Sequence, residues 1–160
     1  MSRDPEVAGL VAALVGTWLG KGEGGYPTIE SFRYRELLEI SERSDHPALH
    51  YEQRTWRITD EGEVVSHWET GLLRVSSDGS LKLTNAQAGR TESMTGSWRR
   101  DNGGWTLELE SDGFSGDQRV RASTRVLSVA AKRLSYEMSM ETTATEKMSA
   151  HLRAELTKQN

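Results

Sequence analysis

The chain has 160 residues, a formal net charge of −4 and no cysteine. This length suits one domain with a substantial core, and the acidic balance argues against a nucleic-acid-binding protein, which usually presents a basic surface. The lack of cysteine excludes disulfides, thiolate zinc sites and thiol nucleophiles. No apolar run is long enough to span a bilayer and none has the form of a signal peptide, so we expect a soluble, cytoplasmic protein.

The N-terminal segment predicts one short amphipathic helix over about residues 5–15. Asp4 is a typical capping residue, and Pro5 favours the first helical position. Apolar residues then recur at helical spacing at Val7, Leu10, Val11 and Leu14. We expect this helix to lie across the end of a larger structure.

A run of alternating glycines follows the helix. One face of an extended strand would carry Gly16, Trp18, Gly20, Gly22 and Gly24. Glycine on a strand face indicates close approach of a ligand or of another backbone. If these glycines face inward, they leave room for something broad and flat.

The same run contains the spacing of a dinucleotide-binding fingerprint, at Gly20, Gly22 and Gly25. That fingerprint needs a strand before it and a helix after it. Here a predicted helix precedes it, and Tyr26-Pro27 follows, which favours extended backbone. The context argues against nucleotide binding.

From residue 32 onward the hydrophobic period changes from helical to alternating. We expect further strands at residues 32–40, 49–58, 66–75, 81–83, 91–99, 105–109, 134–140 and 151–156. Many short strands joined by turns predict an all-β antiparallel barrel or sandwich. A closed barrel is favoured because it leaves no edge strand, and one of eight to ten strands can hold a small ligand.

The four histidines are the candidate metal ligands. His46 lies in an expected turn, His50 and His67 lie on strands with polar neighbours, and His151 opens the last segment. For each of them a surface or hydrogen-bonding role is the commoner one. No two lie at chelating spacing, which argues against zinc, but a single histidine can hold iron whose other positions a macrocycle fills, as in haem.

Catalysis by side chains alone has little support. The sequence has no Gly-x-Ser-x-Gly elbow and no Cys–His pair, and Glu108 and Glu110 share a strand face that we expect to be solvated. Catalysis by a bound cofactor stays open.

Several segments together match the pattern of one known family. They are Gly16-x-Trp18-x-Gly20-x-Gly22-x-Gly24, Tyr26-Pro27-Thr28-Ile29, Phe32-x-Tyr34-x-Glu36, Tyr51-x-Gln53-x-Thr55-Trp56, the run from His67 to Arg74, Leu134-Ser135-Tyr136, Met140 and His151-Leu152-x-Ala154-x-Leu156. In these segments the chain resembles the nitrobindin family, and the glycine ladder joined to Tyr-Pro-Thr-Ile is the most specific part.

The resemblance implies one domain over residues 1–160, with a ten-stranded antiparallel β-barrel over about residues 16–158. It implies one haem b per chain, with His151 as the axial ligand of the iron and Thr28 beside the haem. The activity implied is a ferric haem that binds nitric oxide and isomerises peroxynitrite to nitrate, with His151 acting through the iron. It implies small-molecule ligands, no nucleic-acid or membrane partner, and a monomer or homodimer.

Two segments depart from the family pattern. Gln118 stands in Asp117-Gln118-Arg119-Val120 where the family often has Ala-Lys-x-Val, and Leu127 stands where an Arg-x-Tyr pair ends. We expect both changes at the pocket rim or at propionate contacts. The wall of the pocket is expected to include Leu134, Tyr136, Met138 and Met140.

One feature of the last strand conflicts with a regular barrel wall. His151 shares strand parity with Arg153 and Glu155. Either those charges lie beyond the barrel mouth in water or the segment is irregular, and we expect the first. Two other functions also stay open: a barrel that carries a fatty acid or other apolar ligand, with His151 incidental, and a scaffold whose barrel is filled by its own side chains.

Overall fold

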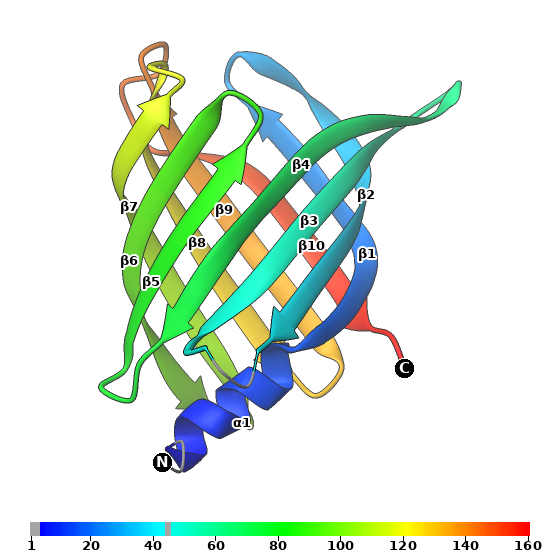
Figure 1. Ribbon diagram of the computed structural model, residues 1–160. Coiled ribbons are helices and arrows are strands. Elements are labelled where there is room, and N and C mark those ends of the chain that lie inside the picture. The colour runs from blue at the N-terminus through cyan, green and yellow to red at the C-terminus, as the bar shows by residue number, and fades with distance from the viewer. Residues whose placement is uncertain (1–3, 44–45) are drawn as a thin grey trace.

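Ten antiparallel strands form a closed barrel in the computed structural model, which describes residues 4–43 and 46–160, and a short helix lies at one end (Figure 1). The elements are α1 (Pro5–Leu14), β1 (Gly16–Tyr26), β2 (Ile29–Glu42), β3 (Ala48–Thr59), β4 (Gly62–Val75), β5 (Ser80–Gln87), β6 (Arg90–Asp101), β7 (Gly104–Gly116), β8 (Val120–Ala130), β9 (Arg133–Thr142) and β10 (Ser149–Lys158). Consecutive strands are neighbours, and β1 pairs with β10 to close the barrel. The predicted all-β barrel of ten strands is confirmed.

Helix α1 covers one end of the barrel, as predicted (Figure 1). The side chain of Asp4 accepts hydrogen bonds from the backbone N–H groups of Glu6 and Val7, at 2.9 and 3.4 Å. At the C-terminal end of the helix, the indole N–H of Trp18 donates to the carbonyl of Leu14 at 2.9 Å, so the helix is fixed to the first strand. The buried face of the helix consists of Val7, Leu10, Val11 and Leu14. Among the described residues, no helix is long and apolar enough to cross a lipid bilayer.

The glycine face of β1 points into the barrel, but the space beside it is already filled. A Cβ at Gly20 would overlap the backbone of β10, one at Gly22 would overlap the Tyr34 ring, and one at Gly24 would overlap the Phe32 ring. These glycines therefore admit a neighbouring backbone and two aromatic rings. The expectation that they leave open space for a flat ligand is wrong.

The close approach at Gly22 gives a first prediction. A Gly22→Ala substitution would place a methyl group against both the Tyr34 ring and the carbonyl of Arg153. Overpacking of this kind costs about 1–3 kcal/mol, and we expect a loss of that size in urea denaturation. The matched control is Gly113→Ala, whose Cβ would meet only the Ser93 hydroxyl at 3.5 Å. Equal stability of the two variants would contradict the prediction.

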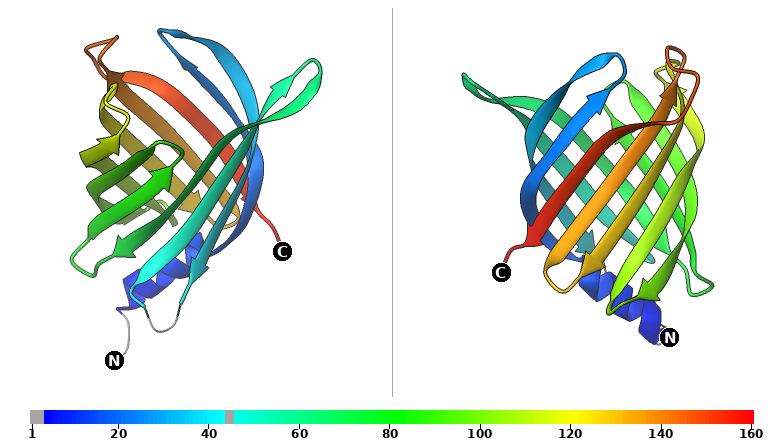
Figure 2. Two further views of the ribbon diagram at one scale, coloured as in Figure 1. Left: turned by 45° about the horizontal axis from the view of Figure 1, so that its top comes forward. Right: turned by 180° about the vertical axis from the view of Figure 1, so that it is seen from behind.

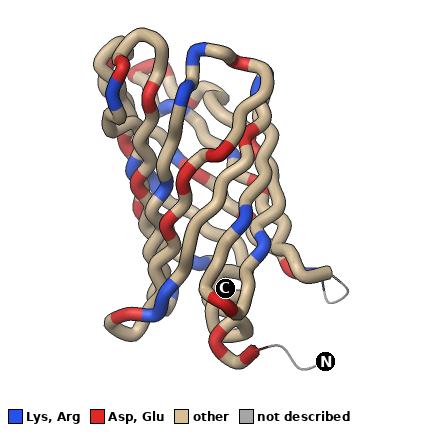
Figure 3. Tube along the Cα trace, turned by 90° about the vertical axis from the view of Figure 1, so that its left-hand side faces the viewer, with Lys and Arg blue, Asp and Glu red and all other residues tan. Residues whose placement is uncertain are grey.

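The end of the barrel opposite α1 is open. The long β3–β4 hairpin bends away from the barrel axis there, so that it leaves the mouth uncovered (Figure 2). Acidic and basic residues are both scattered over the strands of the side seen in Figure 3. That side carries no continuous basic stripe of the kind that nucleic-acid-binding proteins present.

Candidate functional site

A cavity of about 600 Å³ extends from the open mouth toward α1. Its volume lies within the usual range of ligand pockets. Near the mouth it is lined by turn and strand-end residues that include Tyr26, Thr28, Gln87, Arg90, Asp117, Arg119, Thr142 and His151. Deeper down it is lined by apolar residues that include Leu14, Leu38, Ile40, Leu49, Leu73, Leu83, Leu107 and Leu109. The barrel is therefore not filled by its own side chains, and the scaffold alternative loses its premise.

His151 lines this cavity from a bulge in β10. The pairing of β10 with β9 shifts register between Ala150 and Leu152, so His151 is the extra residue. Beyond the bulge, Ala154 and Leu156 are buried, whereas Arg153 is exposed. Because the bulge changes the parity of the strand, the imidazole can face the cavity while later charges face outward.

The outward position of the charge at Arg153 is fixed by an ion pair on the barrel surface. The guanidinium of Arg153 donates to the carboxylate of Glu23 on the neighbouring strand at 2.6 Å. The expectation of a regular strand, with Arg153 and Glu155 facing inward beyond the mouth, is wrong. The irregular alternative describes the segment.

The His151 ring has one nitrogen held by the backbone. Nδ1 lies 2.9 Å from the carbonyl oxygen of Gly25. Since a carbonyl only accepts, Nδ1 carries the proton and Nε2 keeps its lone pair. Partial burial lowers the pKa of His151 below its usual value, which favours the neutral ring. The Tyr26 ring contacts the imidazole edge-on, with the centroids 5.8 Å apart.

Thr28 and the other histidines take different positions. Thr28 lies in the two-residue turn between β1 and β2, is exposed and lines the same cavity as His151. His67 also lines the cavity, where its Nε2 lies 3.3 Å from a carboxylate oxygen of Glu69. His46 and His50 are exposed and lie outside the residues that line this cavity.

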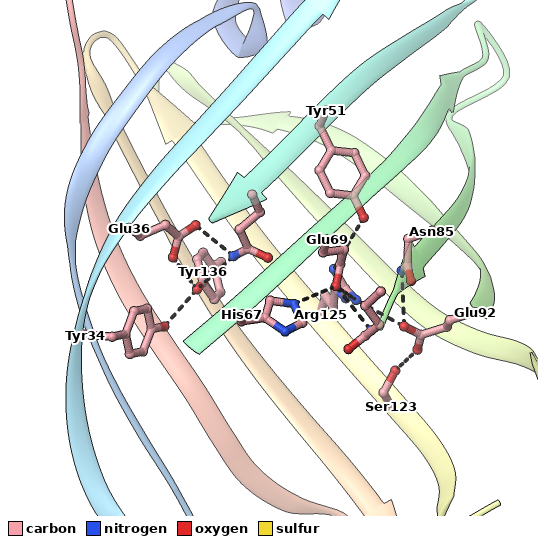
Figure 4. A network of polar contacts seen from close by, with 12 residues as sticks. Tyr34, Glu36, Tyr51, His67, Glu69, Asn85, Glu92, Ser123, Arg125 and Tyr136 are labelled. Carbon is pink, nitrogen blue, oxygen red and sulfur yellow. Dashed lines mark hydrogen bonds and ion pairs between the residues drawn. The ribbon is translucent and has the colours of Figure 1, made fainter. Parts of the chain in front are cut away.

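A polar network contributes side chains to the lining of the cavity (Figure 4). One part is centred on Glu36, which is fully buried. Its carboxylate accepts from the amide of Gln53 at 2.8 Å and from the hydroxyl of Tyr136 at 2.6 Å. Tyr136 in turn lies 2.8 Å from the hydroxyl of Tyr34. The expected cavity wall at Met138 and Met140 is present, but Tyr136 contributes its hydroxyl to this network, and Leu134 is buried outside the cavity lining.

The other part of the network is centred on Arg125. Its guanidinium donates to Glu69 at 2.7 Å and to Glu92 at 3.1 Å, and both carboxylates are buried. Glu69 also accepts from the Tyr51 hydroxyl. Although burial acts to raise the pKa of Glu69, Arg125, His67 and Tyr51 hold it well below its usual range. This part of the network therefore links β4, β6 and β8 through buried ion pairs.

Neither part of this polar network was predicted from the sequence, although the position of Glu36 in the sequence indicates a buried polar site. Glu36 occupies an inward position on β2 between the buried residues Tyr34 and Leu38. A lone carboxylate on an otherwise apolar strand face indicates a buried polar site.

Burial raises the pKa of Glu36 from 4.5 to about 7, against the hydrogen bonds from Tyr136 and Gln53, which lower it. The native state then holds a proton that the unfolded chain releases, so stability falls as the pH rises from about 4.5 to about 7. A Glu36→Gln substitution removes this effect. We expect the variant to be about 1–3 kcal/mol more stable than the wild type at alkaline pH, with no gain in acid.

Urea denaturation of the ligand-free protein at several pH values measures this difference. Glu110→Gln is the matched control, because Glu110 is an exposed acid on the outer face of β7. A stability difference for Glu36→Gln that does not change with pH would contradict the prediction.

The donor set at the mouth fits an iron macrocycle better than a bare ion. In the described part of the chain, no group of three or more His, Cys, Asp or Glu residues is placed to hold a metal. His151 offers a single neutral imidazole nitrogen to a cavity large enough for an organic ligand. A metal bound there would take its other ligands from the molecule that carries it, as iron does in haem.

Comparison with known proteins finds a matching family model, similar sequences and a similar solved structure. A family model described as a THAP4-like, heme-binding beta-barrel domain matches residues 8–158. An Arabidopsis thaliana protein named peroxynitrite isomerase Rv2717c is 38% identical over 146 residues, which cover 91% of this chain and 84% of that protein. A Nocardia farcinica (strain IFM 10152) protein named peroxynitrite isomerase is 36% identical over 156 residues, which cover 95% and 90%. The crystal structure of Rv2717c from M. tuberculosis has a TM-score of 0.88 and 31% identity, and covers 99% of this chain and 100% of that one.

Proposed function

Because the chain belongs to the family of THAP4-like, heme-binding β-barrel domains, the nitrobindin family, we propose that it is a haem-dependent peroxynitrite isomerase. It binds one ferric haem b per chain on His151, with Thr28 beside the haem, and it also binds nitric oxide. The observation that carries the proposal is the His151 imidazole, whose Nδ1 is held by the Gly25 carbonyl, so that Nε2 keeps its lone pair for a ligand.

His151 has the properties that an axial ligand needs. A metal-bound histidine commonly donates its other N–H to a carbonyl, which fixes the tautomer and the orientation of the ring. The Gly25 carbonyl accepts such a bond here, and the edge-on contact with Tyr26 restrains the ring further. The lowered pKa of His151 keeps the ring neutral at physiological pH.

The reaction requires little acid–base chemistry from the protein. Conversion of peroxynitrite to nitrate adds and removes neither a proton nor an electron. Ferric haem, when bound, would supply an electrophilic centre for the peroxynitrite anion. The side chains bind and orient the cofactor, and apolar residues such as Met138 and Met140 limit the entry of water. The arginines at the mouth favour approach of an anion.

Titration of the purified protein with hemin tests this proposal. We expect a Soret band that saturates at one equivalent, and faster decay of peroxynitrite to nitrate by the loaded protein than by free hemin. Binding of a fluorescent fatty acid without any binding of hemin would instead support the alternative of a lipid carrier. We also place the protein in the cytoplasm, since a chain without cysteine has no need of an oxidising compartment.

A further inference from the structure

Four arginines line the cavity in the described part of the chain: Arg57, Arg90, Arg119 and Arg125. Two of them are neutralised by carboxylates. Arg125 lies between Glu69 and Glu92 in the buried network. Arg119 forms a two-point contact with Asp117 across the β7–β8 turn, at 2.7 and 2.9 Å. Both guanidinium groups therefore already have carboxylate partners.

The remaining two arginines differ in burial. Arg57 is exposed, and its guanidinium stacks on the Phe32 ring at 4.2 Å from the centroid. Arg90 is half-buried, and its Nε is a buried donor without a hydrogen-bond partner among the described residues. Its guanidinium carbon lies 5.9 Å from the centroid of the Phe114 ring. A buried donor left without a partner costs free energy, and such an atom in a native protein calls for an explanation.

Arg90 faces the same space as His151 from the other side of the barrel. It is the first residue of β6, and it has the inward parity of Glu92 and Met94, which are both buried. Strands β6 and β10 lie four places apart in the ring of ten. Both side chains nevertheless line the same cavity near its mouth.

We propose that Arg90 binds a propionate carboxylate of the haem that is seated on His151. This inference rests on the haem assignment above. The planar guanidinium matches a carboxylate with two parallel N–H···O bonds, and such a bond would give the buried Nε an acceptor. A carboxylate fixed on the cofactor would be held at this position permanently, whereas a small anionic substrate would only pass through it.

The test compares hemin with its dimethyl ester, in which the carboxylates are esterified and uncharged. Loss of one charge-assisted hydrogen-bonding partner corresponds to roughly 10- to 100-fold in affinity. We expect Arg90→Gln to weaken hemin binding by about this factor and to leave binding of the dimethyl ester unchanged. Arg90→Lys should recover part of the loss. Arg74→Gln is the matched control, because Arg74 is exposed near the closed end of β4.

Two further measurements separate the possible outcomes. The ligand-free Arg90→Gln protein should be about as stable in urea as the wild type, because Arg90 Nε has no hydrogen-bond partner among the described residues and its charge is the smallest of the effects that lower the pKa of Asp117. Nitrite binding to the hemin-loaded variant tests the other source of negative charge. If hemin affinity is unchanged in Arg90→Gln, or if only nitrite binding weakens, the proposal is wrong while the haem assignment stands. If the wild type binds no hemin, both are wrong.

Discussion

Replacing His151 with glycine should weaken hemin binding by more than roughly 100-fold, and millimolar imidazole should restore the Soret band. Loss of a residue that hydrogen-bonds to a metal ligand typically lowers metal affinity or activity about 10- to 100-fold. Loss of the ligand itself should lower hemin affinity further. Added imidazole can enter the space left by the side chain and supply the same nitrogen. The Gly25 carbonyl, to which the native Nδ1 is bonded, remains available to the added imidazole. Titration of hemin into the variant, with and without imidazole, measures both effects.

The control for this experiment is a histidine that lies away from the cavity. His50 is exposed, and its Nε2 lies 2.8 Å from the Thr70 hydroxyl on the outer surface. His50→Ala should bind hemin as the wild type does. The ligand-free His151→Gly protein should remain folded, since the residue sits at a bulge, where glycine is tolerated. An unchanged Soret band in folded His151→Gly without imidazole would contradict the assignment.

Replacing Arg125 with methionine should destabilise the barrel by about 3–5 kcal/mol at neutral pH. Methionine fills much of the same volume, but it leaves the carboxylates of Glu69 and Glu92 buried without their cationic partner. Removal of one member of a buried charge network typically costs this much. Urea denaturation of the ligand-free protein measures the loss.

The pH dependence of this loss identifies its origin. Arg125 holds the pKa of Glu69 well below its usual range, so this stabilisation is present above about pH 4.5 and is lost as the pH falls. The deficit of Arg125→Met should therefore shrink in acid. Arg99→Met is the matched control, because Arg99 forms an ion pair with Glu108 at 2.8 Å on the exposed surface. We expect its effect to be too small to resolve. A loss of stability for Arg125→Met that is no larger than that for Arg99→Met would contradict a stabilising role for these buried ion pairs.

Local sequence patterns predict much of the fold. The Asp4-Pro5 start and the apolar spacing predicted α1, and alternating residues predicted most strands. Strand β8 was not predicted from its pattern, and only the family resemblance implied a tenth strand. Its inward positions include the polar residues Ser123 and Arg125, whereas Val126 is exposed, so this part of the strand lacks the usual pattern of apolar residues facing inward.

The site was less predictable, because its geometry depends on contacts between distant strands. The alternation rule placed His151 and Arg153 on one face, and only the register shift between β9 and β10 separates them. The glycines of β1 predicted a close approach, but the rings of Phe32 and Tyr34 fill that space from the neighbouring strand. No motif singles out Arg90, since its importance comes from a buried Nε that has no hydrogen-bond partner among the described residues.

The role of His151 as the iron ligand is tested by a crystal structure of the hemin-loaded protein with anomalous diffraction collected at the iron absorption edge. We expect one iron peak per chain, bonded to Nε2 of His151, while Nδ1 keeps its hydrogen bond to the Gly25 carbonyl. An iron peak bonded to another side chain, or a haem lodged deep among the leucines without contact to the imidazole, would contradict it.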